Sequence, residues 1–88
     1  MSRPAITIYA ADWCPYCQRA KALLTAKNLV FTAIDVDGDR QRRDEMIARS
    51  ARHSVPQIFI GDKHIGGCDE LAALERCGEL DRLMEGTR

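Results

Sequence analysis

The apolar positions in the N-terminal third of the chain change from a strand-like to a helical pattern. Residues 5–10 (AITIYA) form a short apolar run rich in β-branched side chains, which predicts a buried strand. Residues 15–27 are helix-forming, and their apolar members recur at three- and four-residue spacing. Proline suits the first turn of such a helix, because its missing N–H would have no partner there.

The middle of the chain predicts a second strand and a second helix. Residues 29–35 (LVFTAID) form another apolar run, and DVDGD after them is typical of a turn. Asp39 is placed to cap a helix that continues to about Arg52. The residues predicted to face inward from this helix are Met46, Ile47 and Ala51. His-Ser-Val-Pro at 53–56 ends the helical pattern.

The C-terminal third predicts a hairpin followed by a helix. Residues 57–60 and 63–65 are strand-like, and the Gly-Asp pair between them is a two-residue hairpin signal. A last helix is predicted from about Asp69 through residue 77, with Gly78 as its stop. The tail that follows is expected to add one more helical turn.

The predicted order of elements is therefore β-α-β-α-β-β-α, which belongs to the α/β class. A helix joins the first two strands, so they are expected to be parallel with a right-handed crossover. The last two strands are expected to be antiparallel. The result is a four-stranded mixed sheet with helices on both faces.

Length and charge narrow the classes of function. The chain has 88 residues, which predicts a single domain over residues 1–88. Thirteen basic residues balance 13 acidic ones, so no basic excess indicates nucleic-acid binding. Arginines cluster between residues 40 and 52, but acids are interleaved with them, which is typical of a solvated helix face. The start of the chain leads directly into a strand and no apolar stretch approaches the ~20 residues of a membrane span, so we expect a cytoplasmic protein without membrane association.

Two of the four cysteines lie three residues apart, at Cys14 and Cys17. This spacing alone is compatible with a metal site, a structural disulfide or redox chemistry. Cys14 falls between a predicted strand and a predicted helix, where unpaired backbone N–H groups and the helix dipole favour a thiolate. The other cysteines and the two histidines lack the regular spacing of zinc ligands, so no metal is expected. A disulfide closing so short a loop would constrain the unfolded chain little.

Three segments in order resemble the dithiol glutaredoxins, a branch of the thioredoxin fold, and in particular small bacterial ones. They are CPYC at 14–17, SVPQIFI at 54–60 and IGGCDEL at 65–71, and the resemblance covers essentially the whole chain. It implies a thioredoxin-like fold and thiol–disulfide exchange with glutathione as co-substrate and no tightly bound cofactor. The implied partners are glutathione and proteins that carry disulfides or glutathione adducts, and the implied state is a monomer.

The resemblance also implies roles for individual residues. Cys14 is the expected nucleophile and Cys17 the resolving cysteine. Val55 and Pro56 match a cis-proline turn, which would direct the backbone groups of Val55 toward Cys14, where a glutathione cysteinyl unit could pair with them. The other expected glutathione-binding residues are Gly67, Cys68 and Asp69 for the γ-glutamyl unit, with Arg43 and Tyr16 for the rest of the peptide. Asp69 is also expected to cap the last helix, and Cys68 to contribute only its N–H.

The sequence departs from the family pattern just before Cys14. Ala11 stands where many glutaredoxins have a lysine, and Asp12 adds a negative charge, which opposes thiolate formation. We therefore expect weaker activation of Cys14 than in relatives with that lysine.

Two other functions fit some of these residues. Trp13 before Cys14 is typical of thioredoxins, which are served by a reductase enzyme, although thioredoxins usually carry Gly-Pro between the cysteines and lack GGCD. Some glutaredoxins instead carry an iron–sulfur cluster with glutathione's help, although those that do so readily tend to have a less constrained residue than Pro15 after the first cysteine.

Overall fold

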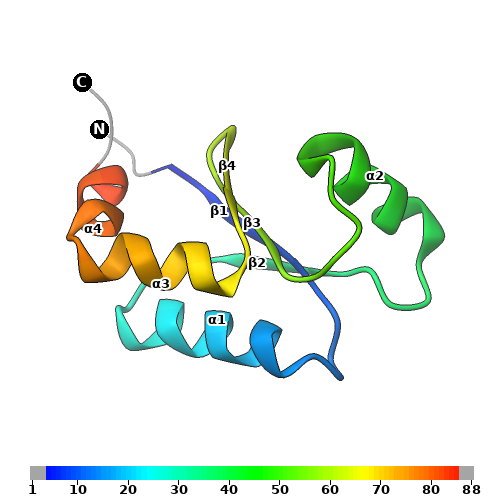
Figure 1. The fold of residues 1–88 in the computed structure, drawn as a ribbon, viewed down its shortest axis with the longest axis horizontal. Helices are drawn as coiled ribbons and strands as arrows, with labels where there is room; N and C mark the ends of the chain where they lie inside the picture. Colours follow the sequence, from blue (N-terminus) through cyan, green and yellow to red (C-terminus); the bar gives the residue numbers. More distant parts are fainter. Residues whose placement is uncertain (1–3, 86–88) are drawn as a thin grey trace.

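The computed structural model describes residues 4–85, which form a four-stranded mixed sheet and four helices (Figure 1). The elements are β1 (Ile6–Ala10), α1 (Pro15–Ala26), β2 (Thr32–Asp35), α2 (Arg40–Ser50), β3 (Gln57–Ile60), β4 (Lys63–Gly66), α3 (Cys68–Arg76) and α4 (Glu79–Met84). The predicted α/β architecture is confirmed, and the predicted extra turn after Gly78 is the separate short helix α4.

The sheet has the strand order β2-β1-β3-β4. Strand β1 pairs with β2 in parallel and with β3 in antiparallel, and β3 pairs with β4 in antiparallel. The two central strands are covered on both faces, so all four residues of β3 are buried. Cys14 follows β1, and Pro56 precedes β3. Because β1 and β3 are antiparallel, the two residues lie at the same end of the sheet.

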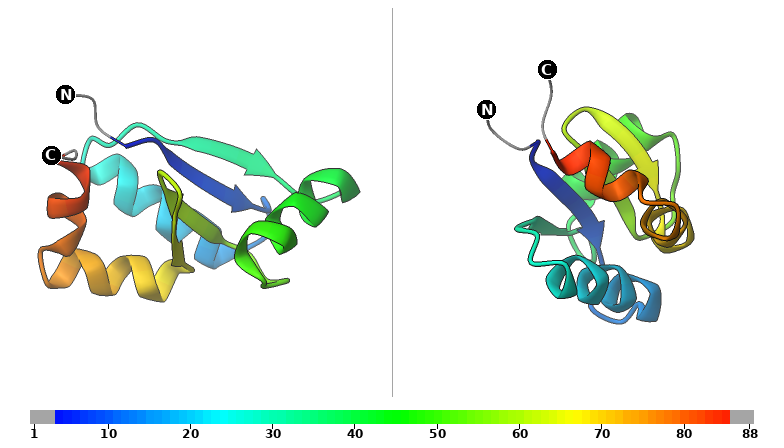
Figure 2. Two further views of the ribbon diagram at one scale, coloured as in Figure 1. Left: turned by 90° about the horizontal axis from the view of Figure 1, so that it is seen from above. Right: turned by 90° about the vertical axis from the view of Figure 1, so that its left-hand side faces the viewer.

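Helices cover both faces of the sheet, as predicted. Helices α1 and α3 lie side by side on one face, and α2 lies on the other (Figures 1 and 2). On the α2 face, a small core cluster consists of Tyr9, Val36, Met46 and Phe59. The Tyr9 hydroxyl donates to Glu45 and accepts from Arg49 at 2.8 Å, and the Arg49 guanidinium lies 4.1 Å from the centre of the Phe59 ring. Arg49 is therefore more than the solvated helix residue that the charge pattern indicated.

The second strand is shorter than predicted, because it begins at Thr32 and not at residue 29. Asn28 adopts φ +60°, and the Leu29 N–H donates to the Leu24 carbonyl at 3.0 Å. These residues therefore complete the end of α1 before the chain turns into β2. Val30, which the apolar pattern placed in the strand, has 90% of its surface exposed.

The end of α2 corrects a second prediction. Ala51 does not face inward: it is exposed and adopts the left-handed conformation, φ +60°, that closes the helix. Ser50 is buried in its place, and its hydroxyl donates to the Met46 carbonyl at 2.7 Å. The predicted cap at the other end is confirmed, since the Asp39 carboxylate accepts the Arg42 N–H at 3.0 Å.

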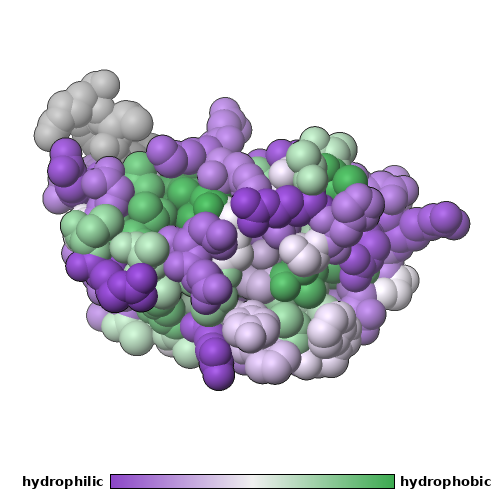
Figure 3. Space-filling view, viewed as in Figure 1, coloured by the Kyte–Doolittle hydropathy of each residue, from purple (hydrophilic) through white to green (hydrophobic). Residues whose placement is uncertain are grey.

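The surface seen in Figure 3 shows apolar side chains in separate patches among hydrophilic ones. None of the helices between residues 4 and 85 combines the length and the apolar character that crossing a membrane requires.

Candidate functional site

Cys14 lies at the junction between β1 and α1, where the sequence pattern placed it. It immediately precedes the helix in an extended conformation, and Pro15 occupies the first helical turn. The Cys14 side chain is 4% exposed, and its N–H donates to the Ala11 carbonyl at 3.2 Å. The positive end of the α1 dipole thus begins at Cys14.

Cys17 lies one helical turn further along α1 and is fully buried. The pKa of its thiol is raised to about 11, mainly by burial, and the neighbouring Cys14 contributes in the same direction. Cys17 is therefore a protonated thiol at neutral pH and must lose its proton when it attacks. Both cysteines are free thiols in this structure.

The loop before β3 faces Cys14 from across the sheet end. The Val55–Pro56 peptide bond is cis, as predicted. The Val55 carbonyl oxygen lies 3.8 Å from Cys14 Sγ, although the two residues are 41 positions apart in the sequence. The expected approach of the Val55 backbone to Cys14 is thus present.

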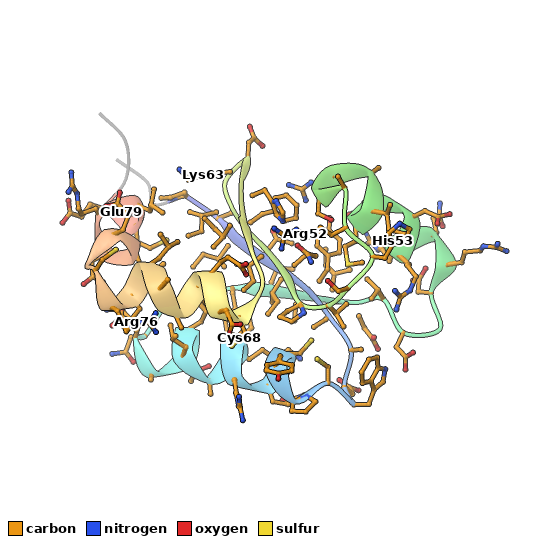
Figure 4. All side chains as sticks on the ribbon, in the orientation of Figure 1. Arg52, His53, Lys63, Cys68, Arg76 and Glu79 are labelled. Carbon is orange, nitrogen blue, oxygen red and sulfur yellow. The ribbon has the colours of Figure 1, made fainter. Side chains whose placement is uncertain are left out.

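A cleft of about 180 Å³ opens between this loop, the first turn of α1 and the beginning of α3. Six residues predicted to bind glutathione line it: Tyr16, Val55, Pro56, Gly67, Cys68 and Asp69. Four further residues that the sequence interpretation did not select also line it: Arg52, Ser54, Gln57 and Glu70. Figure 4 shows Cys68 at the beginning of α3, Arg52 between the β-hairpin and α2, and His53 beside α2.

The α3 side of the cleft is built around Glu70 and not around Asp69. The Glu70 carboxylate accepts the Gly67 N–H at 2.7 Å, and this hydrogen bond is the main cause of a lowered Glu70 pKa. The prediction that Asp69 caps this helix is therefore wrong, because Gly67 is the N-cap residue and Asp69 lies exposed in the first turn. Glu70 is three positions after the N-cap, and a residue there is well placed to reach back in this way.

Two small residues allow the cleft to form. Gly66 has φ +117°, and a Cβ atom at this position would lie 3.0 Å from side-chain carbons of Glu70. A Cβ at Gly67 would lie 3.4 Å from the carbonyl oxygen of Pro56. Side chains at these two positions would therefore strain the β4–α3 turn and crowd the opposite wall.

Arg43 is not among the residues that line this cleft. It lies on α2, where its guanidinium donates to the His53 carbonyl at 3.1 Å, and it lines a separate hollow with Gly38 and Asp39. Arg43 thus contacts the loop that carries Val55, and its contact with glutathione stays a prediction.

A family model described as Glutaredoxin matches residues 6–65, which is most of the chain. Glutaredoxin 3 from Escherichia coli K12 is 52% identical over 80 residues, which cover 91% of this chain and 96% of that protein. The chain belongs to the glutaredoxin family. It is accordingly a glutathione-dependent thiol–disulfide oxidoreductase.

Solved glutaredoxin structures have the same fold. The solution structure of glutaredoxin from Brucella melitensis superposes with a TM-score of 0.83 at 50% identity, covering 96% of this chain and 91% of that one. A buckwheat glutaredoxin–glutathione complex gives a TM-score of 0.84 at 27% identity, covering 93% and 77%. The thioredoxin-like sheet and helices predicted from the sequence are therefore confirmed for this glutaredoxin.

The surroundings of Cys14 in this glutaredoxin include two exposed aromatic side chains. Trp13 is 65% exposed and Tyr16 is 52% exposed, and the Arg19 guanidinium lies 5.4 Å from the centre of the Tyr16 ring. Burial raises the pKa of the half-buried Cys68, so this cysteine is a thiol at neutral pH. Across residues 4–85, no three His, Cys, Asp or Glu side chains gather in a way that could hold a metal ion.

Introducing the lysine that the family often carries should increase the reactivity of Cys14. Ala11 is 1% exposed, so a lysine there must bury its aliphatic chain and extend its ammonium outward, near the active-site turn. We expect Ala11→Lys to raise the alkylation rate of Cys14 at pH 7 about two- to fivefold, because unit charges a few ångströms apart in water interact by up to about 1 kcal/mol. The measurement is the rate of iodoacetamide labelling against pH, read by mass spectrometry of the peptide containing Cys14.

Ala22→Lys is the matched control, because Ala22 is exposed on α1, about two helical turns beyond Cys14. A labelling midpoint at lower pH in the wild type than in Ala11→Lys would contradict the expectation.

Proposed function

We propose that residues 1–88 form a single glutaredoxin domain that reduces protein disulfides and glutathione mixed disulfides as a monomer in the cytoplasm. The observation that carries the proposal is the position of Cys14 Sγ, nearly buried and 3.8 Å from the Val55 carbonyl at the edge of the cleft. Glutathione occupies this cleft, with its cysteinyl unit beside Val55 and its γ-glutamyl carboxylate near the first turn of α3. The chemistry assigned to each cysteine follows from its position.

In the first step, the Cys14 thiolate attacks one sulfur of the substrate disulfide. The S–S bond breaks, the departing sulfur takes a proton, and Cys14 holds the other half as a mixed disulfide. On a protein substrate, Cys17 loses its proton and attacks Cys14 Sγ, which releases the second substrate thiol and forms the Cys14–Cys17 disulfide. Two glutathione molecules then reduce this disulfide and leave as oxidised glutathione.

A glutathionylated protein follows a shorter route. Cys14 takes the glutathione unit and releases the protein thiol. A second glutathione then attacks the sulfur of the bound glutathione, so oxidised glutathione leaves and the Cys14 thiolate returns. Cys17 has no part in this route, although it lies next to the reacting sulfur.

A coupled assay tests the proposal. The protein is supplied with a glutathionylated peptide, glutathione, glutathione reductase and NADPH, and NADPH consumption is followed. We expect turnover in this assay and none when thioredoxin reductase replaces glutathione and its reductase. The opposite result would favour the thioredoxin-like alternative that Trp13 suggests. A visible absorption band after anaerobic purification would instead support the iron–sulfur alternative.

A further inference from the structure

The loop that carries Val55 is held by side chains from several elements. Three consecutive carbonyls of this loop, those of residues 53–55, each have a side-chain donor within hydrogen-bond range. The donors are Arg43 to His53 (3.1 Å), Gln57 Nε2 to Ser54 (2.9 Å) and Cys14 Sγ to Val55 (3.8 Å). The position of this wall of the cleft therefore depends on side-chain contacts.

Gln57 is the most buried of these donors that the redox mechanism does not use, being 1% exposed at the first position of β3. Its Nε2 donates to the Ser54 carbonyl at 2.9 Å and lies 3.3 Å from the Ser54 hydroxyl. Its Oε1 lies 2.7 Å from Nε2 of His64. Both ends of the amide thus have partners, as a buried polar group requires.

This arrangement determines which nitrogen of His64 carries a proton. Because Nε2 of Gln57 donates to Ser54, its Oε1 is the acceptor, so Nε2 of His64 must be the donor. His64 lies on β4 with its ring 5.0 Å from that of Phe59, which fixes the ring plane. The pKa of His64 is lowered, first by burial and then by the Arg52 charge, while Glu70 opposes this. Nε2 carries a proton in both the neutral and the charged ring, so the hydrogen bond to Gln57 survives the titration.

The contact with Ser54 bears directly on the glutathione-binding backbone. The Ser54 carbonyl and the Val55 N–H belong to one planar peptide group. Fixing the oxygen therefore fixes the direction of the N–H, and the Val55 carbonyl is the group that faces Cys14. A tilt of this peptide plane would misdirect the Val55 N–H, which is one of the two backbone groups that a bound cysteinyl unit would pair with.

We propose that Gln57, oriented by His64, is a positioning residue that sets how tightly this cleft binds the glutathione half of the substrate. The proposal rests on the proposed function, in which glutathione occupies the cleft beside Val55. Gln57 and His64 act through Ser54 and do not touch the reacting sulfurs, so they affect binding more than the exchange step.

Gln57→Leu tests the proposal by removing both donations to Ser54. We expect the KM for a glutathionylated peptide to rise about five- to tenfold with kcat changed less than about twofold, as for the loss of one or two net hydrogen bonds that act on binding. Gln57→Glu should behave in the same way, because a carboxylate can accept from His64 but cannot donate to Ser54. The variants should fold, because Ser54 is exposed and His64 only half-buried, so water can replace the lost partner. Urea unfolding checks this directly.

His64→Phe should raise the KM about two- to threefold, because the ring stays on Phe59 while Gln57 loses its orienting donor. In the double variant Gln57→Leu/His64→Phe the KM should equal that of Gln57→Leu alone, since His64 acts through Gln57. Gln41→Leu, an exposed residue of α2, is the matched control and should leave both constants unchanged.

Three results would overturn the positioning role: an unchanged KM in Gln57→Leu, a wild-type KM in Gln57→Glu, or effects of Gln57→Leu and His64→Phe that simply multiply. A fall in kcat with KM unchanged would also contradict it. If the proposed function itself fails, the wild-type protein will show no turnover of the glutathionylated peptide, which separates that failure from failure of the positioning role.

Discussion

Replacing Cys17 by serine should abolish the reduction of protein disulfides and largely retain the removal of glutathione from glutathionylated peptides. Cys17 is fully buried, and a serine hydroxyl fits the same space but cannot attack a disulfide sulfur. The mixed disulfide of Cys14 with a protein substrate would therefore persist. Glutathione can still attack a glutathione unit bound to Cys14, because that step does not need the second thiol. The measurement compares the coupled assay on a protein disulfide and on a glutathionylated peptide.

Cys77→Ser is the control for this experiment, because Cys77 is exposed at the end of α3, away from the cleft. It should leave both activities unchanged. Loss of both activities in Cys17→Ser, with folding intact, would show that Cys17 has a further role in activating Cys14.

Replacing Cys14 by serine should remove both activities and leave only the background reaction of glutathione with the substrate. Cys68 and Cys77 do not substitute for Cys14. Burial keeps the Cys68 thiol protonated, and Cys77 lies outside the cleft. Turnover of either substrate above the background would contradict the assignment of the nucleophile.

The Cys14→Ser variant also removes the thiol next to Cys17, so that the labelling of Cys17 can be followed in its own peptide by mass spectrometry. Burial is the largest cause of the raised pKa of Cys17, so its labelling by iodoacetamide at neutral pH should be slow. The labelling rate should keep increasing with pH beyond the usual thiol pKa of about 8.5. Below its pKa, the thiolate fraction increases about tenfold for each pH unit. A labelling midpoint near or below the usual thiol range would mean that the buried position does not disfavour the charge.

Local sequence patterns were sufficient for most of the fold. The apolar run in β1, the Asp39 cap of α2 and the Gly61–Asp62 hairpin each depend on neighbouring residues, and each is confirmed. The patterns failed where apolar residues at the ends of elements serve another purpose. Ala51 closes a helix with a left-handed conformation, and Val30 lies in the connection to β2, yet neither differs in type from a core residue.

Only those cleft residues that lie in family motifs were predicted from the sequence. Pro56, Gly67 and Cys68 were found through such motifs, and they line the cleft. Arg52 and Gln57 line it too, but no role in the cleft was predicted for them, because their positions there depend on how distant segments pack. A glutamine beginning an otherwise apolar strand was the one available signal for Gln57, since a buried amide requires partners.

The separation of 41 positions between Cys14 and Val55 has a consequence for how activity arises during folding. In the unfolded chain the CPYC segment is an ordinary flexible dithiol, without the Val55 carbonyl beside it or a cleft to receive a peptide. These features exist only after β1 has paired with β3 and α3 has docked, which are long-range events that close large loops and come late for entropic reasons. Recovery of turnover during refolding should therefore lag behind the formation of helical structure, and activity reports assembly of the complete domain.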